Sequence, residues 1–369
     1  MRSALKFSAI ALASFIAACG GAIGGDGGGD DQPGDDSGDR RVPHDLDAYT
    51  HDGGGEPLPG DDAGGRHYDT APPSDDAPPP PPPPSDTGAP PFDAGPPPDT
   101  ARPDGCYTEV YSPTVSITDL VSSFSGGNWL DTSLQVTKRR YPTGNFILET
   151  EKGDPQLAGF KDSSSFDALM ESLMTMCHEE THGYDYEHSS AGKHAYVMRT
   201  DLVISVPIGS TFPRSEVLTY ITDDSTSLYD DTYLKGSMGT YDFADMNDEL
   251  NAYTNGLACL TAVQEHEKGG ISARDGAVAH ILYLQLYLKR ARTAHASVYS
   301  TLKADGDWQK YVKYAWARVF FWDGKAKAFP ALTIGADRIW THVKEAANLD
   351  EIRQFTGREP ADVACHPEK

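Results

Sequence analysis

Basic residues are scarce in this sequence, and no apolar run is long enough to form a transmembrane helix. Lys and Arg number 31 against 55 Asp and Glu, so the 369-residue chain carries a net charge of −24. Such an acidic balance argues against nucleic acid as a partner, because phosphate binding depends on clustered cations. The apolar stretch 281–288 is far shorter than the roughly 20 residues that span a bilayer. The sequence also shows no internal repeat, which excludes repeat architectures.

The N-terminus has the pattern of a bacterial export signal. Arg2 and Lys6 precede a short apolar run, and the sequence I-A-A-C at positions 16–19 follows it. This tetrapeptide resembles a lipobox, which is cleaved just before its cysteine. The resemblance implies a lipoprotein signal peptide at 1–18 and a membrane anchor on Cys19, whose acyl chains bind the lipid bilayer. An ordinary secretory signal with a coincidental cysteine is the alternative.

The segment 19–105 reads as a disordered tether. Residues 20–105 hold half of the 36 glycines and most of the 27 prolines, with almost no apolar side chains to form a core. The proline run 78–84 predicts a stiff polyproline II spacer. Gly20, rather than Asp, follows the lipobox cysteine, which by enterobacterial sorting favours the outer membrane. We therefore expect a lipid-anchored protein of the bacterial cell envelope, at the outer membrane or the cell surface.

Residues 106–369 are long enough for one large domain, or for two closely packed subdomains. The pattern predicts an α+β class with a small sheet and a largely helical C-terminal half. The expected strands are 108–117, 133–138, 145–151 and 195–207, with 133–138 and 145–151 paired as a hairpin. The expected helices after the sheet are 243–267, 273–304, 308–322 and 337–347.

Four cysteines fall in this region and could pair, because an exported protein meets an oxidising environment. Cys106 and Cys365 bracket the domain, and domain termini often lie close together, so we favour a disulfide between them. Four cysteines nevertheless allow three pairings. Cys177 lies on the apolar stripe of an expected helix, which predicts a core residue and not a metal ligand.

That helix carries the most informative motif in the chain, H-E-E-T-H at 178–182. Six apolar residues recur at helical spacing before and within it: Phe166, Leu169, Met170, Leu173, Met174 and Cys177. Ser163 to Ser165 offer N-caps, and Gly183 could end the helix. Residues four apart on a helix lie on one face, so His178 and His182 can bind one ion.

The H-E-x-x-H motif resembles that of the zincin metallopeptidases, most like the gluzincins, over about residues 164–260. The resemblance implies a zinc ion held by two histidines and a carboxylate from a second helix. Glu249 is the candidate for this carboxylate, because it borders an apolar stripe and a charge there needs a partner. Gly256, two turns later, would permit close approach to another helix.

His188 is the competing third ligand. The spacing of His178, His182 and His188 is that of the metzincins, and Met238 could form their Met-turn. Two departures weaken this alternative: Asp185 replaces the metzincin glycine, and a large helical segment follows Met238. The sequence alone leaves both ligand sets open.

The resemblance further implies hydrolysis of a peptide or protein substrate by a zinc-activated water, with Glu179 as general base. Tyr253 would donate to the oxyanion, and His194 and His266 are other possible donors. Zincins align substrate on an edge strand, for which we expect 145–151.

A non-catalytic lipoprotein is the alternative function. Such a protein would bind a partner or glycan, and four tryptophans of the helical half could form its surface: Trp308, Trp316, Trp322 and Trp340. Aromatic residues at helical spacing are more often core residues. Substrate specificity and oligomeric state do not follow from the sequence.

Overall fold

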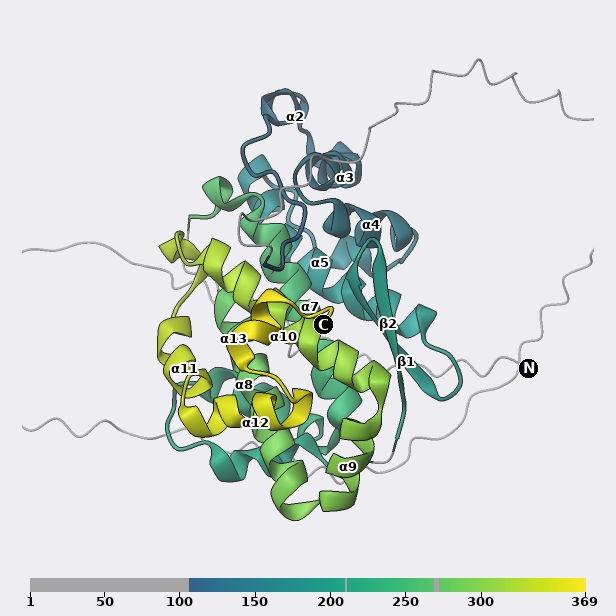
Figure 1. Ribbon diagram of the computed structural model, residues 1–369. Coiled ribbons are helices and arrows are strands. Elements are labelled where there is room, and N and C mark those ends of the chain that lie inside the picture. Colours follow the sequence, from purple (N-terminus) through teal and green to yellow (C-terminus); the bar gives the residue numbers. More distant parts are fainter. Residues whose placement is uncertain (1–105, 210, 269–271) are drawn as a thin grey trace, which may run out of the picture. The chain divides into compact units, whose positions relative to one another are not determined.

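The computed structural model describes residues 106–209, 211–268 and 272–369. The expected signal peptide, the anchor at Cys19 and the tether lie outside these described residues. The described part is mostly helical and contains a two-stranded antiparallel sheet, in agreement with the expected α+β class (Figure 1). Among the described residues, no helix has both the length and the apolar character needed to cross a membrane.

Helices precede the sheet, where the sequence had suggested strands. The helices are α2 (Thr118–Ser123), α3 (Trp129–Arg140), α4 (Pro142–Thr150) and α5 (Phe166–His188). The strands predicted at 133–138 and 145–151 are therefore wrong, and so is the substrate-aligning edge strand at 145–151. The strand predicted at 108–117 is also wrong, because this segment forms turns and irregular backbone. The buried positions of α3 and α4 recur at i, i+1, i+4 and i+5, which is helical spacing. Pro142 stands in the first turn of α4, where its fixed φ and missing N–H are tolerated.

The sheet is a hairpin of β1 (Lys193–Arg199) and β2 (Leu202–Pro207), which begins two residues before the predicted extended stretch 195–207 and ends with it. Strand β1 packs against α5 and α7, and β2 packs against α10. The buried carboxylate of Asp185 on α5 accepts hydrogen bonds from the Val197 amide and from Asn251 Nδ2, each at 2.7 Å. Asp185 thus joins α5, the hairpin and α7 from a helical position, so it forms no metzincin-like turn.

The C-terminal half is helical, as predicted. Its helices are α6 (Ser227–Tyr229), α7 (Phe243–Thr261), α8 (Ala273–Ala294), α9 (Ala296–Ala304), α10 (Gly306–Ala326), α11 (Ala336–Val343), α12 (Ala346–Thr356) and α13 (Pro360–Cys365). The predicted helix 273–304 is divided into α8 and α9 at His295, whose φ of −130° and ψ of 57° are not helical. The four tryptophans of this half are all buried, so they belong to the core and form no binding surface.

Helix α5 begins as the sequence predicted and ends later. Ser165 caps its N-terminus by accepting the Ala168 amide at 3.1 Å, and the six apolar residues of the stripe are buried. The helix does not end at Gly183 but continues to His188. Tyr184 and Asp185, directly after the glycine, are buried against neighbouring elements, and this packing maintains helical backbone through a residue that has no intrinsic preference for it.

Two disulfides close the described domain. The predicted Cys106–Cys365 bridge is confirmed, and it joins the start of the domain to its last helix. Cys177 lies in the core as predicted, where it is bonded to Cys259 and links α5 to α7. A buried ion pair of Arg318 with Glu109, 2.6 Å apart, also fastens the first residues of the domain to α10.

Candidate metal centre

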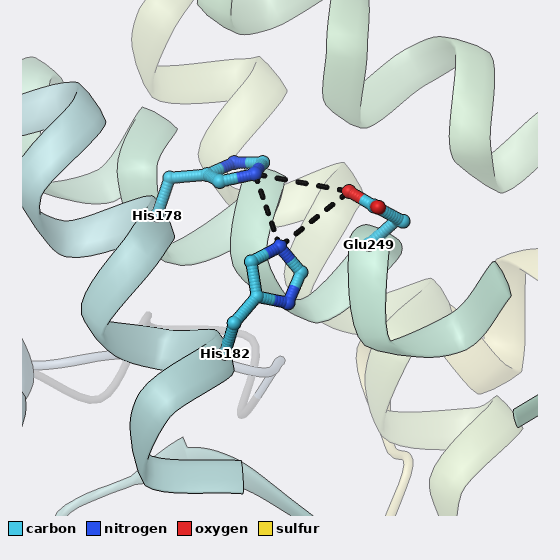
Figure 2. A group of neighbouring side chains, drawn as sticks. All are labelled: His178, His182 and Glu249. Carbon is cyan, nitrogen blue, oxygen red and sulfur yellow. Dashed lines mark hydrogen bonds and ion pairs between the residues drawn. The ribbon is translucent and has the colours of Figure 1, made fainter. Parts of the chain in front are cut away.

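Helices α5 and α7 bring two imidazoles and one carboxylate together (Figure 2). His178 Nε2 lies 3.2 Å from His182 Nε2. Glu249 Oε2 lies 3.7 Å from the first of these nitrogens and 3.5 Å from the second. Among the described residues, these three form a group of three closely spaced ligand atoms that could hold a metal ion. The histidines stand one turn apart on α5, and Glu249 reaches them from α7.

The close packing of α5 on α7 makes this convergence possible. A Cβ added to Gly256 of α7 would lie 2.9 Å from the carbonyl oxygen of Met174 and 3.4 Å from Cβ of His178. A larger residue at 256 would therefore push the two helices apart. The Cys177–Cys259 disulfide fixes the same pair of helices one residue away from His178. The expected role of Gly256 in close approach is confirmed.

The spacing of the three donor atoms fits a small tetrahedral ion. Atoms bound at about 2.0–2.1 Å to a tetrahedral zinc lie roughly 3.4 Å from one another, close to the observed 3.2, 3.7 and 3.5 Å. Oε2 of Glu249 is buried and has no hydrogen-bond donor at normal distance, which is a costly arrangement unless a cation is present. Two nitrogens and one carboxylate oxygen are the donor set of a catalytic zinc.

Burial and nearby charge hold two of the ligands, His178 and Glu249, in the protonation states that metal binding requires. Burial lowers the pKa of His178 to about 3, so this imidazole is neutral at pH 7 and ready to bind metal. Burial would also raise the pKa of Glu249, but the adjacent His182 and His178 outweigh that effect and lower it. Glu249 is therefore ionised.

Asp248 supports His182 from behind and was not singled out from the sequence. Its Oδ2 lies 2.6 Å from His182 Nδ1, and its Oδ1 lies 3.4 Å from His194 Nε2. Burial lowers the pKa of His182, but Asp248 and Glu249 outweigh it and raise the pKa well above 6.5. A carboxylate on the far nitrogen of a metal-binding histidine fixes the ring orientation and increases its basicity. The one feature of the sequence that could have indicated a role for Asp248 is that it directly precedes Glu249.

Glu179 directly follows the first ligand, and the charges of His182 and Glu249 act on it. It is partly buried, and burial raises its pKa to about 7, with a further increase from Glu249 and a decrease from His182. A carboxylate with a pKa near neutrality is suited both to accept and to return a proton.

Tyr253 contacts His178 through its ring, and its hydroxyl is bonded to another tyrosine. Its ring meets the His178 imidazole edge to face, with centroids 4.5 Å apart, and stacks on His280. Its hydroxyl forms a 2.7 Å hydrogen bond with the Tyr233 hydroxyl. Gly276 of α8 makes room for the ring, because a Cβ there would overlap it. These contacts fit a residue that positions His178.

The remaining candidates lie elsewhere, except His194. His188 is exposed at the end of α5, where its Nδ1 lies 2.9 Å from the Tyr184 carbonyl oxygen and its ring stacks on Tyr184. His266 pairs with Asp167 at the start of α5. Met238 lies in a short 3-10 helix, and its carbonyl oxygen accepts from Arg214. Of the two possible third ligands, the structure brings Glu249 to the histidines and leaves His188 outside the group.

Comparison with protein-family models, with curated proteins and with solved structures finds no match to this chain.

Proposed function

We propose that this chain is a zinc-dependent peptidase with a zincin-like site. The observation that carries the proposal is the convergence of His178, His182 and Glu249, with donor atoms 3.2 to 3.7 Å apart. Zinc prefers this ligand set when it serves a catalytic role, because three protein ligands leave one position free. Glu179 beside the ligands is the feature that a purely structural metal site would not require.

Each of these residues has a separate role in the proposed peptide hydrolysis. His178, His182 and Glu249 would hold the ion, and Asp248 orients the His182 ring by accepting a hydrogen bond from its Nδ1–H. Zinc in such a site supplies a Lewis acid that polarises a carbonyl and acidifies water. Glu179 takes the proton from the attacking water and returns it to the departing amine, which its pKa of about 7 permits. Tyr253 holds the His178 ring in place.

The stoichiometry of bound zinc tests this proposal most directly. The purified full-length chain should contain about one equivalent of zinc by elemental analysis. The variant His178→Ala should lose it, because one of three ligands is gone. His188→Ala is the matched control: it removes an exposed histidine from the same helix and should keep the zinc. A wild-type chain that binds no zinc would contradict the peptidase proposal.

We also propose that Cys19 anchors the protein in the cell envelope. The support is the lipobox pattern, which lies outside the described residues. Wild-type protein expressed in a bacterial host should sediment with membranes, and Cys19→Ala should appear in the soluble envelope fraction or retain its signal peptide. Equal sedimentation of both proteins would show that the cysteine is not the anchor.

A further inference from the structure

A second group of carboxylates lies at the junction of α4 and α5, on another face of the motif helix. Glu180 is 1% exposed and Glu151 is 4% exposed. Their Oε2 atoms lie 3.7 Å and 3.6 Å from one point, the position that a Cβ on Gly183 would occupy. Both acids therefore border the bare glycine backbone, where the absent side chain leaves space.

These carboxylates lie in mostly acidic surroundings, with His188 as the basic group that acts on Glu151. Both oxygens of Glu180 and Oε1 of Glu151 are buried without a hydrogen-bond partner. The four strongest charges that act on Glu180 come from Asp154, Glu151, Glu179 and Glu187, and all are carboxylates. Unpaired buried carboxylates of like charge are among the most costly arrangements in a protein interior.

The backbone adds further negative character. Glu151 is the C-cap of α4, so its carboxylate stands at the end of a helix where carbonyl oxygens carry partial negative charge. Carboxylates and backbone carbonyls are the oxygen ligands that hard divalent cations prefer, and flexible oxygen sites of this kind suit Ca²⁺ better than Mg²⁺. The group offers no nitrogen or sulfur ligand of the type that zinc selects.

We propose that Glu151 and Glu180 bind a calcium-class cation that fastens α4 to α5. The cation would neutralise the two buried carboxylates and fix the part of α5 that follows the H-E-x-x-H motif. The site is separate from the His178, His182 and Glu249 group, and its existence does not depend on peptidase activity. The alternative is a proton shared between the two carboxylates, which would halve their charge without any bound ion.

Thermal unfolding of the full-length, zinc-supplied protein with and without calcium tests the proposal. The midpoint should rise by several degrees in about 10 mM CaCl₂, since exported calcium sites bind at about 10⁻⁴ to 10⁻³ M. Glu180→Gln should remove most of this rise. Glu171→Gln is the matched control, because residue 171 lies nine positions earlier on α5 and so on roughly the opposite face; it should keep the rise.

Two results would overturn the proposal. A wild-type midpoint that ignores calcium would favour the shared proton, and an equal rise in Glu180→Gln would place binding elsewhere on the acidic chain. Bound zinc, measured in the same samples, should not change with calcium. The calcium experiment can therefore be interpreted even if the zinc proposal fails.

Terbium luminescence covers the case in which Glu180→Gln does not fold. Tb³⁺ replaces Ca²⁺ at oxygen sites and emits when a nearby tyrosine is excited. Tyr184 stands one turn after Glu180, and the charge of Glu151 acts on it. Wild-type protein should give emission that Ca²⁺ displaces and that Glu151→Gln or Tyr184→Phe greatly reduces. Emission unaffected by both substitutions would contradict the site.

Discussion

Two faces of α5 bury acidic groups in opposite ways. On the face toward α7, Glu249 and Asp248 each lie against an imidazole, and the histidines lower the pKa of both carboxylates. On the face toward α4, Glu180 lies among other acids, and burial with Asp154 and Glu151 raises its pKa to about 8. The first face pairs its carboxylates with imidazoles inside the protein, whereas the charges that act most strongly on Glu180 on the second face are all carboxylates. Burial of a carboxylate therefore does not by itself identify a functional site; the charged groups around the carboxylate must also be considered.

Removing the carboxylate of Glu179 gives the largest expected effect and tests whether the α7 face is catalytic. Glu179→Gln keeps the shape of the side chain but cannot accept a proton. Hydrolysis of an unfolded protein should fall by about 10² to 10⁴-fold, the usual contribution of a general base. Zinc content should remain near one equivalent. Unchanged hydrolysis in this variant would refute the role of Glu179.

The substitution Glu249→Gln tests the third ligand. It replaces a buried anion with a neutral amide, so zinc affinity should fall by more than about 100-fold, beyond the effect of outer-shell changes. A competition titration with a zinc-binding dye measures this. His188→Ala should leave affinity within about a factor of two of the wild type, because the ring points to Tyr184. The reverse pattern would establish a metzincin-like ligand set.

The next prediction tests the contact between His182 and Asp248 on the α7 face. Asp248→Asn removes the charge behind the imidazole and keeps the volume. Zinc affinity should fall by about 10 to 100-fold, as for other carboxylates that orient a histidine ligand. The same titration measures this, and Asp245→Asn, one turn earlier on α7, is the control. An affinity equal to that of the wild type would show that the 2.6 Å contact has no role in binding.

Tyr253→Phe should have the smallest effect. The substitution removes the hydrogen bond to Tyr233 but keeps the ring against His178, so stability should fall by about 0.5 to 1.5 kcal/mol. The turnover number should decrease by less than about tenfold. A loss of about 10² to 10³-fold in turnover at unchanged zinc content would instead assign the hydroxyl to the oxyanion.

Features that depend on local periodicity were predictable from the sequence, whereas contacts between residues distant in the sequence were not. The apolar stripe and Ser165 predicted the start of α5, and the i, i+4 spacing placed His178 with His182. Helices α3 and α4 were mistaken for strands because short segments rich in Thr, Val and Ile satisfy both periods. Pro142 at the first turn of α4 was the signal that should have decided between them.

The sequence by itself determined the motif helix, the two histidines and the candidates for the third ligand, because these depend on spacing along one helix. Only the tertiary structure distinguished Glu249 from the other candidate for the third ligand. The approach of α7 at Gly256 brings the Glu249 carboxylate within 3.7 Å of one nitrogen of each imidazole. Packing likewise decided that Asp248 supports His182 and that Glu151 and Glu180 both border Gly183. These contacts join residues about 30 to 70 positions apart, and no local pattern encodes such a meeting.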